Sequence, residues 1–238
     1  MRGKFITFEG GEGSGKSTQA SLLAGRLRTL GISVILTREP GGSPGAEMVR
    51  HVLLAGAAKP LGAEAEAILF AAARADHLEK TIRPALERGA WVVCDRFADS
   101  TRVYQGAVGK VDDTVIRALE RVTVGDTRPD LTIMLDLPAE LGLSRAAGRR
   151  EGAAADRFEG EELAFHAALR DAYRVIAAAE PERCVVIEAE PPPHRISDEV
   201  WTVVCARLGA AQVETEPPAA PPAPAGASEP ARDVVAVP

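Results

Sequence analysis

The chain has 238 residues, a formal net charge of −6 at pH 7 and a hydrophobic content of 46%. This length is sufficient for one sizeable domain whose core needs no disulfides. The negative net charge argues against broad polynucleotide binding, which requires an extended cationic surface. The apolar run near the amino terminus is too short for a signal peptide or a membrane-spanning helix, so we expect a cytoplasmic protein without membrane partners.

Five short runs rich in Val, Ile or Phe predict buried strands of a parallel sheet. They cover residues 4–9, 33–37, 91–95, 131–137 and 184–188. Apolar residues recur every three or four positions elsewhere, which predicts helices over 16–30, 64–88, 112–125, 140–147, 161–179 and 196–208. Because strands separated by crossover helices form βαβ units, we predict a doubly wound α/β domain with a five-stranded parallel sheet and helices on both faces.

The composition changes abruptly near residue 210. From Glu214 onward Pro, Ala and Glu dominate, and large apolar side chains are almost absent before Val234. Segments of this kind usually stay extended in solvent, and docking in an aromatic groove of a partner is the alternative. We therefore expect a folded domain over 1–209 and a disordered Pro/Ala-rich tail over 210–238.

The segment between the first predicted strand and the first predicted helix fits G-x-x-x-x-G-K-[ST], the phosphate-binding P-loop. Its glycines let backbone N–H groups turn toward the phosphates, and the dipole of the following helix adds favourable potential. Lys16 is expected to reach the β and γ oxygens, and Ser17 to ligate Mg²⁺. The residues expected to bind ATP here are Gly10, Gly11, Glu12, Gly13, Ser14, Gly15, Lys16, Ser17 and Thr18.

A P-loop leaves open whether a protein is a GTPase, an ATP-driven motor or a small-molecule kinase. The chain contains no Asn and so lacks the Asn-Lys-x-Asp element expected of a guanine-specific GTPase. A nucleotide-dependent switch module would need an effector surface, which the sequence does not indicate. The remaining motifs must therefore distinguish the kinases.

The third predicted strand ends in Asp95, and Arg96 follows directly. They stand at the carboxyl edge of the sheet, where α/β proteins bind ligands. Asp95 is suited to hold Mg²⁺ directly or through water, and Arg96 to clamp a phosphate with its planar donor fork. A simple surface ion pair is the alternative for this fragment taken alone.

Several motifs occur together in one order along the chain. They are Glu9 before the P-loop, Thr37-Arg38-Glu39-Pro40-Gly41-Gly42, Phe70-x-x-x-Arg74, Asp95-Arg96-Phe97 and Ser100-Thr101-x-x-Tyr104-Gln105-Gly106. With this order and spacing, the chain resembles bacterial thymidylate kinases over residues 3–208. The resemblance implies the P-loop NTPase fold of nucleoside monophosphate kinases and the ATP- and Mg²⁺-dependent phosphorylation of dTMP to dTDP by a homodimer. A kinase of another nucleoside monophosphate or of a deoxynucleoside is the alternative.

The resemblance also implies which residues bind the base and sugar of the acceptor. Phe70 would stack on thymine and Arg74 would contact the base, and their four-residue spacing puts both on one helix face. Tyr104 would stand against the 2′ position and oppose a ribose hydroxyl. The whole expected substrate-binding set is Glu9, Arg38, Arg50, Phe70, Arg74, Arg96, Ser100, Thr101, Tyr104 and Gln105.

The phosphate and metal ends of the site follow from the same resemblance. Arg96 and Arg50 would approach the dTMP phosphate, with Arg38 as a further candidate. Glu9 would accept the sugar 3′-hydroxyl and help to order Mg²⁺. The expected metal-binding residues are Ser17, Asp95 and Glu9.

Arginines cluster with Gly and Ala over 144–159, after the fourth predicted strand. In nucleotide kinases a lid brings positive charge over the transferring phosphoryl group and excludes water. The P-loop spacer holds no Arg, which fits the bacterial arrangement with the catalytic arginine in the lid. Arg149 is the first choice and Arg150 the second, while Arg145 or Arg157 could share the role. We expect Arg145 and Arg150 to contact ATP, and Lys16, Arg96, Arg149 and Glu9 to be catalytic.

Overall fold

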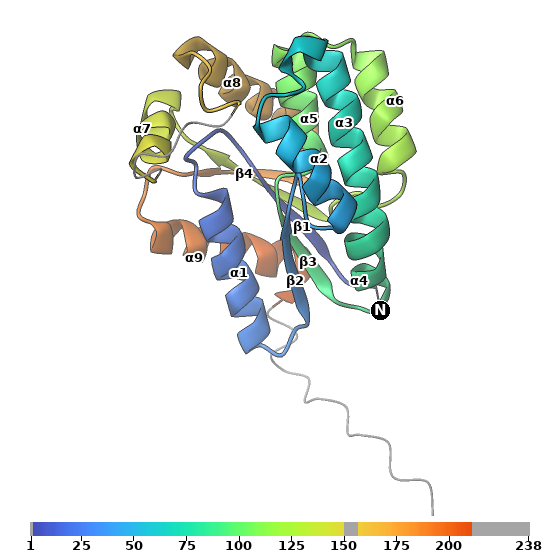
Figure 1. Cartoon of the computed structure of the whole chain (residues 1–238). Coiled ribbons are helices and arrows are strands. Elements are labelled where there is room, and N and C mark those ends of the chain that lie inside the picture. The colour runs from blue at the N-terminus through green and yellow to red at the C-terminus, as the bar shows by residue number, and fades with distance from the viewer. Residues whose placement is uncertain (1, 150–156, 211–238) are drawn as a thin grey trace, which may run out of the picture.

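The computed structural model of the chain describes residues 2–149 and 157–210 (Figure 1). In this part of the chain, five parallel strands form one sheet in the order β2-β3-β1-β4-β5. The strands are β1 (Phe5–Glu9), β2 (Val34–Arg38), β3 (Trp91–Asp95), β4 (Leu131–Asp136) and β5 (Cys184–Glu188). Their bounds agree with the predicted ones to within one residue, so the predicted five-stranded parallel sheet is confirmed.

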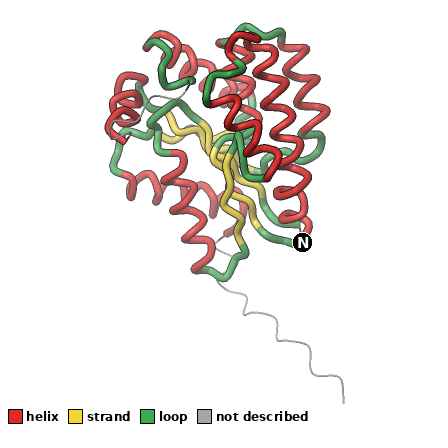
Figure 2. Tube along the Cα trace, viewed as in Figure 1, coloured by secondary structure: helices red, strands yellow, loops and turns green. Residues whose placement is uncertain are grey.

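Helices cover both faces of the sheet, as Figure 2 shows with strands in yellow and helices in red. One face carries α1 (Lys16–Thr29) and α9 (Pro193–Leu208). Both helices share an apolar cluster with Ile6 and Phe8 of β1. Because successive side chains of a strand point to opposite faces, Phe5 packs on the other side of the sheet.

The opposite face carries α8 (Leu163–Ala179) and a long helical run with α6 (Asp113–Thr123) beside it. The run consists of α3 (Gly62–His77), a π-helical turn η2 (Leu78–Ile82) and α4 (Arg83–Glu87). The second half of this run buries Leu78, Ile82 and Leu86 against the sheet. The strand residues in the same apolar cluster are Phe5 of β1 and Val92 and Cys94 of β3. The helix predicted over 64–88 is therefore one run that contains a π-helical turn.

Helical elements that the sequence did not predict are α2 (Pro44–Leu54), α5 (Ala98–Thr101), the π-helical η3 (Arg102–Val108) and the short 3₁₀ helix η1 (Lys59–Leu61). The start of α2 is stabilised by Asp76, a residue of α3. Its carboxylate accepts hydrogen bonds from the backbone N–H groups of Gly45 and Ala46 at 2.9 and 3.2 Å. A cap supplied from such a distance in sequence cannot be read from the residues around α2, although Ser43 and Pro44 form a local helix start.

The helix α7 (Ala139–Arg149) lies against the P-loop because two glycines meet there. A Cβ atom at Gly13 would stand 2.0 Å from the carbonyl oxygen of Gly142, and one at Gly142 would stand 2.3 Å from that of Glu12. Gly13 also has a φ of +66°, which side-chain-bearing residues rarely adopt. These contacts fix the helix that leads into the predicted lid against the phosphate-binding loop.

Some predictions fall outside the described residues. They concern Arg150, the following lid residues up to 156 and the tail from 211 onward, while Arg149 is described only as the last residue of α7. Ala210, predicted to begin the tail, is fully buried in the core beside Val204. Over residues 2–149 and 157–210, no helix has both the length and the apolar character that crossing a membrane requires.

Candidate active site

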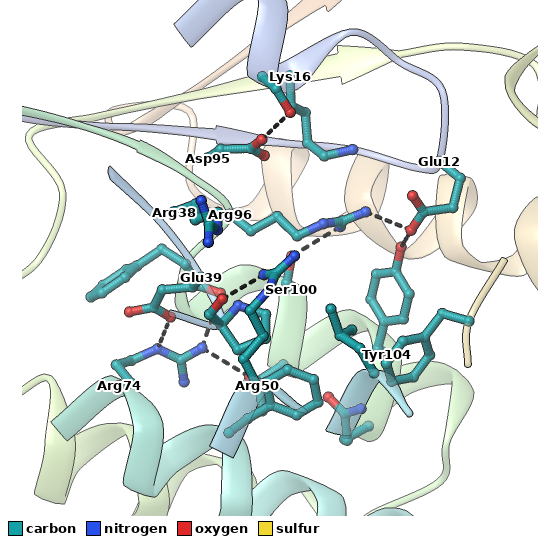
Figure 3. Close-up of a pocket in the computed structure, with 18 of the residues that line it drawn as sticks. Glu12, Lys16, Arg38, Glu39, Arg50, Arg74, Asp95, Arg96, Ser100 and Tyr104 are labelled. Carbon is teal, nitrogen blue, oxygen red and sulfur yellow. Dashed lines mark hydrogen bonds and ion pairs between the residues drawn. The ribbon is translucent and has the colours of Figure 1, made fainter. Parts of the chain in front are cut away.

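The carboxyl ends of β1, β2 and β3 open into a cavity of about 220 Å³ (Figure 3). Most of the predicted site residues line it. These are Glu12, Gly13, Gly15, Lys16, Ser17, Arg38, Arg50, Phe70, Arg74, Asp95, Arg96, Ser100, Thr101, Tyr104 and Gln105. The fold therefore brings predicted site residues from the P-loop, α2, α3 and the segment after β3 to one cavity. Predicted residues that do not line it are Glu9, Gly10, Gly11, Ser14, Thr18 and Arg145.

The P-loop lysine points back into its own loop. Its Nζ atom donates to the carbonyl oxygen of Gly11 at 2.7 Å and to the hydroxyl of Ser14 at 3.3 Å. Burial, followed by the positive charge of Arg96, lowers the pKa of Lys16 from 10.5 to about 8. An incoming phosphate would compensate that buried charge, so the loop is built to bind an anion.

The hydroxyl of Ser17, at the start of α1, donates to the carboxylate of Asp95 at the end of β3. Two oxygen donors thus meet beside the loop. Mg²⁺ in nucleotide sites takes one or two protein oxygens and completes its shell with phosphate oxygens and water. The Ser17–Asp95 pair fits that pattern of ligands.

Arg96 lies beside the P-loop at one end of the cavity. Its Nη2 donates to the Glu12 carboxylate at 2.6 Å, and its Nη1 donates to the carbonyl oxygen of Gly10 at 3.2 Å and to the hydroxyls of Ser100 and Tyr173 at 3.3 Å. The residue has a φ of +69°, an uncommon conformation for a side-chain-bearing residue. This backbone turn brings the guanidinium back over the P-loop.

Glu12 is the carboxylate that neutralises Arg96. It also accepts a hydrogen bond of 2.8 Å from the hydroxyl of Tyr104, as Figure 3 shows. Burial raises the pKa of Glu12, but the charges of Arg96 and Lys16 and the hydrogen bond from Tyr104 outweigh burial and lower it from 4.5 to about 2. Glu12 is therefore an ionised counterion within the loop.

Glu9 is fully buried beneath this cluster. One oxygen accepts hydrogen bonds from the backbone N–H groups of Phe97 at 2.7 Å and Ser100 at 3.3 Å. The other accepts from the hydroxyl of Ser100 at 2.7 Å and that of Tyr173 at 3.3 Å. Burial, followed by the negative charge of Asp99, raises the pKa of Glu9 from 4.5 to about 7.

The other end of the cavity is aromatic and holds Arg74. The rings of Phe70 and Tyr104 flank Phe158, with centroid separations of 6.1 and 5.3 Å. Arg74 is buried, and its Nη2 donates to the hydroxyl of Thr101 at 3.0 Å. A planar base would find a ring face here and a fixed guanidinium at its edge.

The two arginines from the β2–α2 region differ in placement. Arg50 turns toward the cavity, where its Nη1 donates to the carbonyl oxygen of Pro40 at 2.6 Å. Arg38 pairs with Glu47 at 3.1 Å and is largely exposed. Arg50 is therefore the better placed of the two for a bound phosphate.

Comparison with known proteins identifies this arrangement. A family model described as thymidylate kinase matches residues 8–200. The chain belongs to the thymidylate kinase family. It is 59% identical over 216 residues to the thymidylate kinase of Nitrobacter winogradskyi, covering 91% of this chain and 94% of that protein. It is 60% identical over 210 residues to that of Afipia carboxidovorans, covering 88% and 92%.

A solved structure agrees with this assignment. The crystal structure of thymidylate kinase from Ehrlichia chaffeensis is 35% identical and superposes with a TM-score of 0.69, covering 86% of this chain and 99% of that one. The P-loop nucleoside monophosphate kinase fold predicted from the sequence is thereby confirmed.

Two of the arginines assigned to the lid from the thymidylate kinase resemblance have described side chains. Arg145 donates to the carbonyl oxygens of Ala189 at 2.7 Å and Glu190 at 2.9 Å, so it ties α7 to the loop after β5. Arg157 pairs with Glu66 at 3.3 Å and with Glu161, and its guanidinium lies over Phe158. The guanidinium groups of Arg145 and Arg157 are thus both bound to other groups of the protein.

Some residues of this thymidylate kinase site were not assigned from the sequence. Tyr173 of α8 reaches Glu9, Arg96 and Ser100, but its surroundings in the sequence are an ordinary amphipathic helix. Phe158 follows a charged run that gave no sign of an aromatic wall. Glu39 stands in the quoted Thr37 to Gly42 motif, so its position was available although its role was not.

Proposed function

We propose that the chain transfers the γ-phosphoryl group of ATP to the phosphate of dTMP, forming dTDP and ADP, through the side chains that surround this cavity. One observation carries the proposal: a P-loop opens directly onto a cavity that has arginines at one end and aromatic rings at the other. Membership of the thymidylate kinase family supports the same reaction. None of the observations favours another acceptor or a switch module.

In this proposal the aromatic end of the cavity binds the thymine base. Phe70 stacks on the base and Arg74 donates to its edge, while Thr101 and Gln105 close the pocket. Tyr104 opposes a ribose 2′-hydroxyl, because its ring is fixed by Phe158 and its hydroxyl is already bonded to Glu12.

At the phosphate end, Lys16 and Arg96 share the negative charge of the transferring group. Phosphoryl transfer has a loose transition state whose charge spreads over the equatorial oxygens, so cations and positioning matter more than covalent catalysis. The dTMP phosphate oxygen is the nucleophile. Arg50 is proposed to approach the same phosphate, with Arg38 in a secondary role.

Ser17 and Asp95 are the proposed magnesium-binding side chains, since their oxygens already meet beside the loop. The bound ion would supply charge neutralisation for the ATP phosphates. Both oxygens of Glu9 accept hydrogen bonds from Phe97, Ser100 and Tyr173, so we propose that Glu9 contributes through water and through the sugar 3′-hydroxyl.

Arg149 and Arg150 remain the proposed catalytic and ATP-contacting arginines of the lid. The support is the position of α7, which is fixed against the P-loop and ends at Arg149. Arg145 is proposed to border the ATP site from its anchored position beside Ala189.

ADP release measured with ATP in the presence and absence of dTMP tests the proposed function. We expect release to depend on dTMP, with dTDP formed in equal amount. A slow ATP hydrolysis that ignores dTMP would instead identify a switch module and contradict the proposal.

A homodimer is proposed as the assembly. Helices α2, α3 and α6 lie side by side in Figure 1, and apolar side chains on them face solvent: Met48 is 69% exposed and Val122 is 80% exposed. A second copy would cover such a surface. Light scattering is expected to give twice the chain mass for the wild type, and a monomer mass would contradict the assembly.

A cytoplasmic location is proposed because the three cysteines are free thiols, as in reducing compartments.

A further inference from the structure

Four polar side chains form a chain of hydrogen bonds behind the aromatic end of the cavity. The hydroxyl of Thr37 on β2 lies 2.8 Å from Nε2 of His77 on α3. Nδ1 of the same ring lies 3.1 Å from Oε1 of Glu39. The second carboxylate oxygen of Glu39 accepts from Nε of Arg74 at 2.8 Å. His77, Glu39 and Arg74 are each at least nine-tenths buried.

The donors and acceptors in this chain fix one another. A carboxylate only accepts, so Nδ1 of His77 carries the proton that is donated to Glu39. In the neutral ring Nε2 then accepts, and the Thr37 hydroxyl donates to it. Both ring nitrogens of His77 and both carboxylate oxygens of Glu39 therefore have partners within this network.

The hydrogen bonds of Arg74 leave one of its nitrogens, which carries two N–H donors, for a ligand. Its Nε is bound to Glu39, and its Nη2 is bound to the carbonyl oxygen of Phe97 at 3.1 Å and to the hydroxyl of Thr101 at 3.0 Å. Among the described residues, Nη1 has no hydrogen-bond partner, and Arg74 lines the cavity. The planar guanidinium is therefore locked at two nitrogens and presents the third.

We propose that Glu39 and His77 are positioning residues that set the acceptor-base selectivity of the enzyme by holding Arg74 with Nη1 toward the base edge. A fixed N–H donor favours a base with a carbonyl oxygen at that edge, as in thymine. It disfavours an amino group there, as in cytosine, because two donors then face each other. The inference rests on the proposed function, which brings the base to this end of the cavity.

Steady-state kinetics of the full-length protein with dTMP and with dCMP as acceptors test this role. Glu39→Gln removes the charged acceptor of Arg74 and is expected to raise the KM for dTMP by about tenfold or more. The preference for dTMP over dCMP should fall by a similar factor. The KM for ATP and the kcat with dTMP should change by less than about threefold, because no hydrogen bond among the described residues joins the P-loop to these four side chains.

Glu39→Gln leaves a buried guanidinium without its counterion, which destabilises the fold. His77→Leu and Thr37→Val disturb the same hydrogen-bond network with a smaller loss of fold stability. We expect His77→Leu to raise the KM for dTMP by about three- to tenfold, and His77→Asn to recover part of this loss because its amide can donate to Glu39. Thr37→Val should give the smallest effect in the same direction.

Thr127→Val is the matched control. Thr127 is buried, and its hydroxyl accepts a hydrogen bond of 3.0 Å from Arg83, which lies on the same helical run as His77. Neither Thr127 nor Arg83 is among the residues that line the cavity. Thr127→Val and Thr37→Val each remove one buried hydroxyl, so both should lower the melting temperature by a similar amount. Thr127→Val should leave the KM for dTMP and the preference for dTMP over dCMP unchanged.

The outcomes separate this inference from the proposed function. A wild type that does not prefer dTMP would contradict the function itself. Arg74→Leu raising the KM for dTMP while folded Glu39→Gln and His77→Leu keep the wild-type KM and selectivity would overturn the inference alone. An effect of these variants on stability or kcat only, with both KM values and selectivity unchanged, would also overturn it.

Discussion

The two ends of the cavity hold their arginines in different ways. At the base end, Arg74 is bound to the carboxylate of Glu39, the carbonyl oxygen of Phe97 and the hydroxyl of Thr101, and one nitrogen is left for the ligand. At the phosphate end, Arg96 and Lys16 are bound to the atoms of the P-loop itself, including the ionised Glu12. The orientation of Arg74 is therefore fixed before the acceptor binds, whereas Arg96 and Lys16 have to exchange their hydrogen-bond partners within the protein for phosphate oxygens.

This difference indicates how binding energy is divided. A preset donor costs little reorganisation, so the base end should contribute selectivity in the ground state. Cations that are neutralised by the protein become available when phosphates replace their partners, so the phosphate end should contribute mainly to the transition state. Variants at the two ends should therefore separate into effects on KM and effects on kcat.

The largest effect is expected for Lys16→Ala. The variant removes a buried cation from the transferring group, so kcat should fall by about a thousandfold while the fold stays intact. Quenched-flow or coupled assays with circular dichroism as the folding check measure this. Arg117→Ala, an exposed arginine of α6, is the control and should keep wild-type turnover. A Lys16→Ala variant with unchanged turnover would contradict the assignment.

Glu9 tests the charge balance beneath the phosphate end. Its pKa is raised from 4.5 to about 7, so the folded state holds a proton that the unfolded state has lost between these values. The stability contributed by the protonated carboxyl is therefore full below pH 4.5 and is lost as the pH rises to about 7. Glu9→Gln should flatten this fall, which amounts to roughly 3 kcal/mol. Urea unfolding at several pH values measures it, and equal slopes in both proteins would contradict the assigned pKa.

Phe70→Ala tests the base end directly. Loss of a stacking ring is expected to raise the KM for dTMP by about tenfold, because base–aromatic stacking contributes roughly 1–3 kcal/mol. The KM for ATP should stay unchanged. A fall in kcat without a change in the KM for dTMP would break the proposed division between the two ends.

The smallest effect is expected for Glu12→Gln. Removing the charge that competes for Arg96 should lower the dissociation constant for dTMP by about threefold, while the ligand-free protein loses stability. Calorimetric titration and thermal unfolding measure the two changes. Weaker dTMP binding would mean that Glu12 supports Arg96 and does not compete with the phosphate.

The sequence predicted those parts of the site that are written in consecutive residues. The P-loop is one continuous motif in a strand–loop–helix context, and Asp95 and Arg96 stand at the end of a recognisable buried strand. Contacts that join distant segments could not be predicted in this way. Arg74 and Glu39 are 35 residues apart, and Tyr173 and Glu9 are 164 residues apart.

The fold shows the same division between local and distant signals. The sheet was predicted because buried parallel strands are continuous apolar runs. The helix α2 was missed although Ser43 and Pro44 are a typical helix start, since the amides of its first turn are capped by Asp76 from α3. The segment from α5 to η3 was missed because only Arg96 and Phe97 separate it from β3, which leaves no visible boundary in the sequence.

The most direct test of the central claim is the ratio of kcat/KM for dTMP to that for dUMP, dCMP and AMP, measured with the wild-type protein and ATP. Because the base end presents one fixed donor nitrogen and an aromatic wall, we expect dTMP to be the best acceptor and dCMP and AMP to be poor ones. If dTMP were no better than these other monophosphates, the assignment of the cavity to thymine would be wrong.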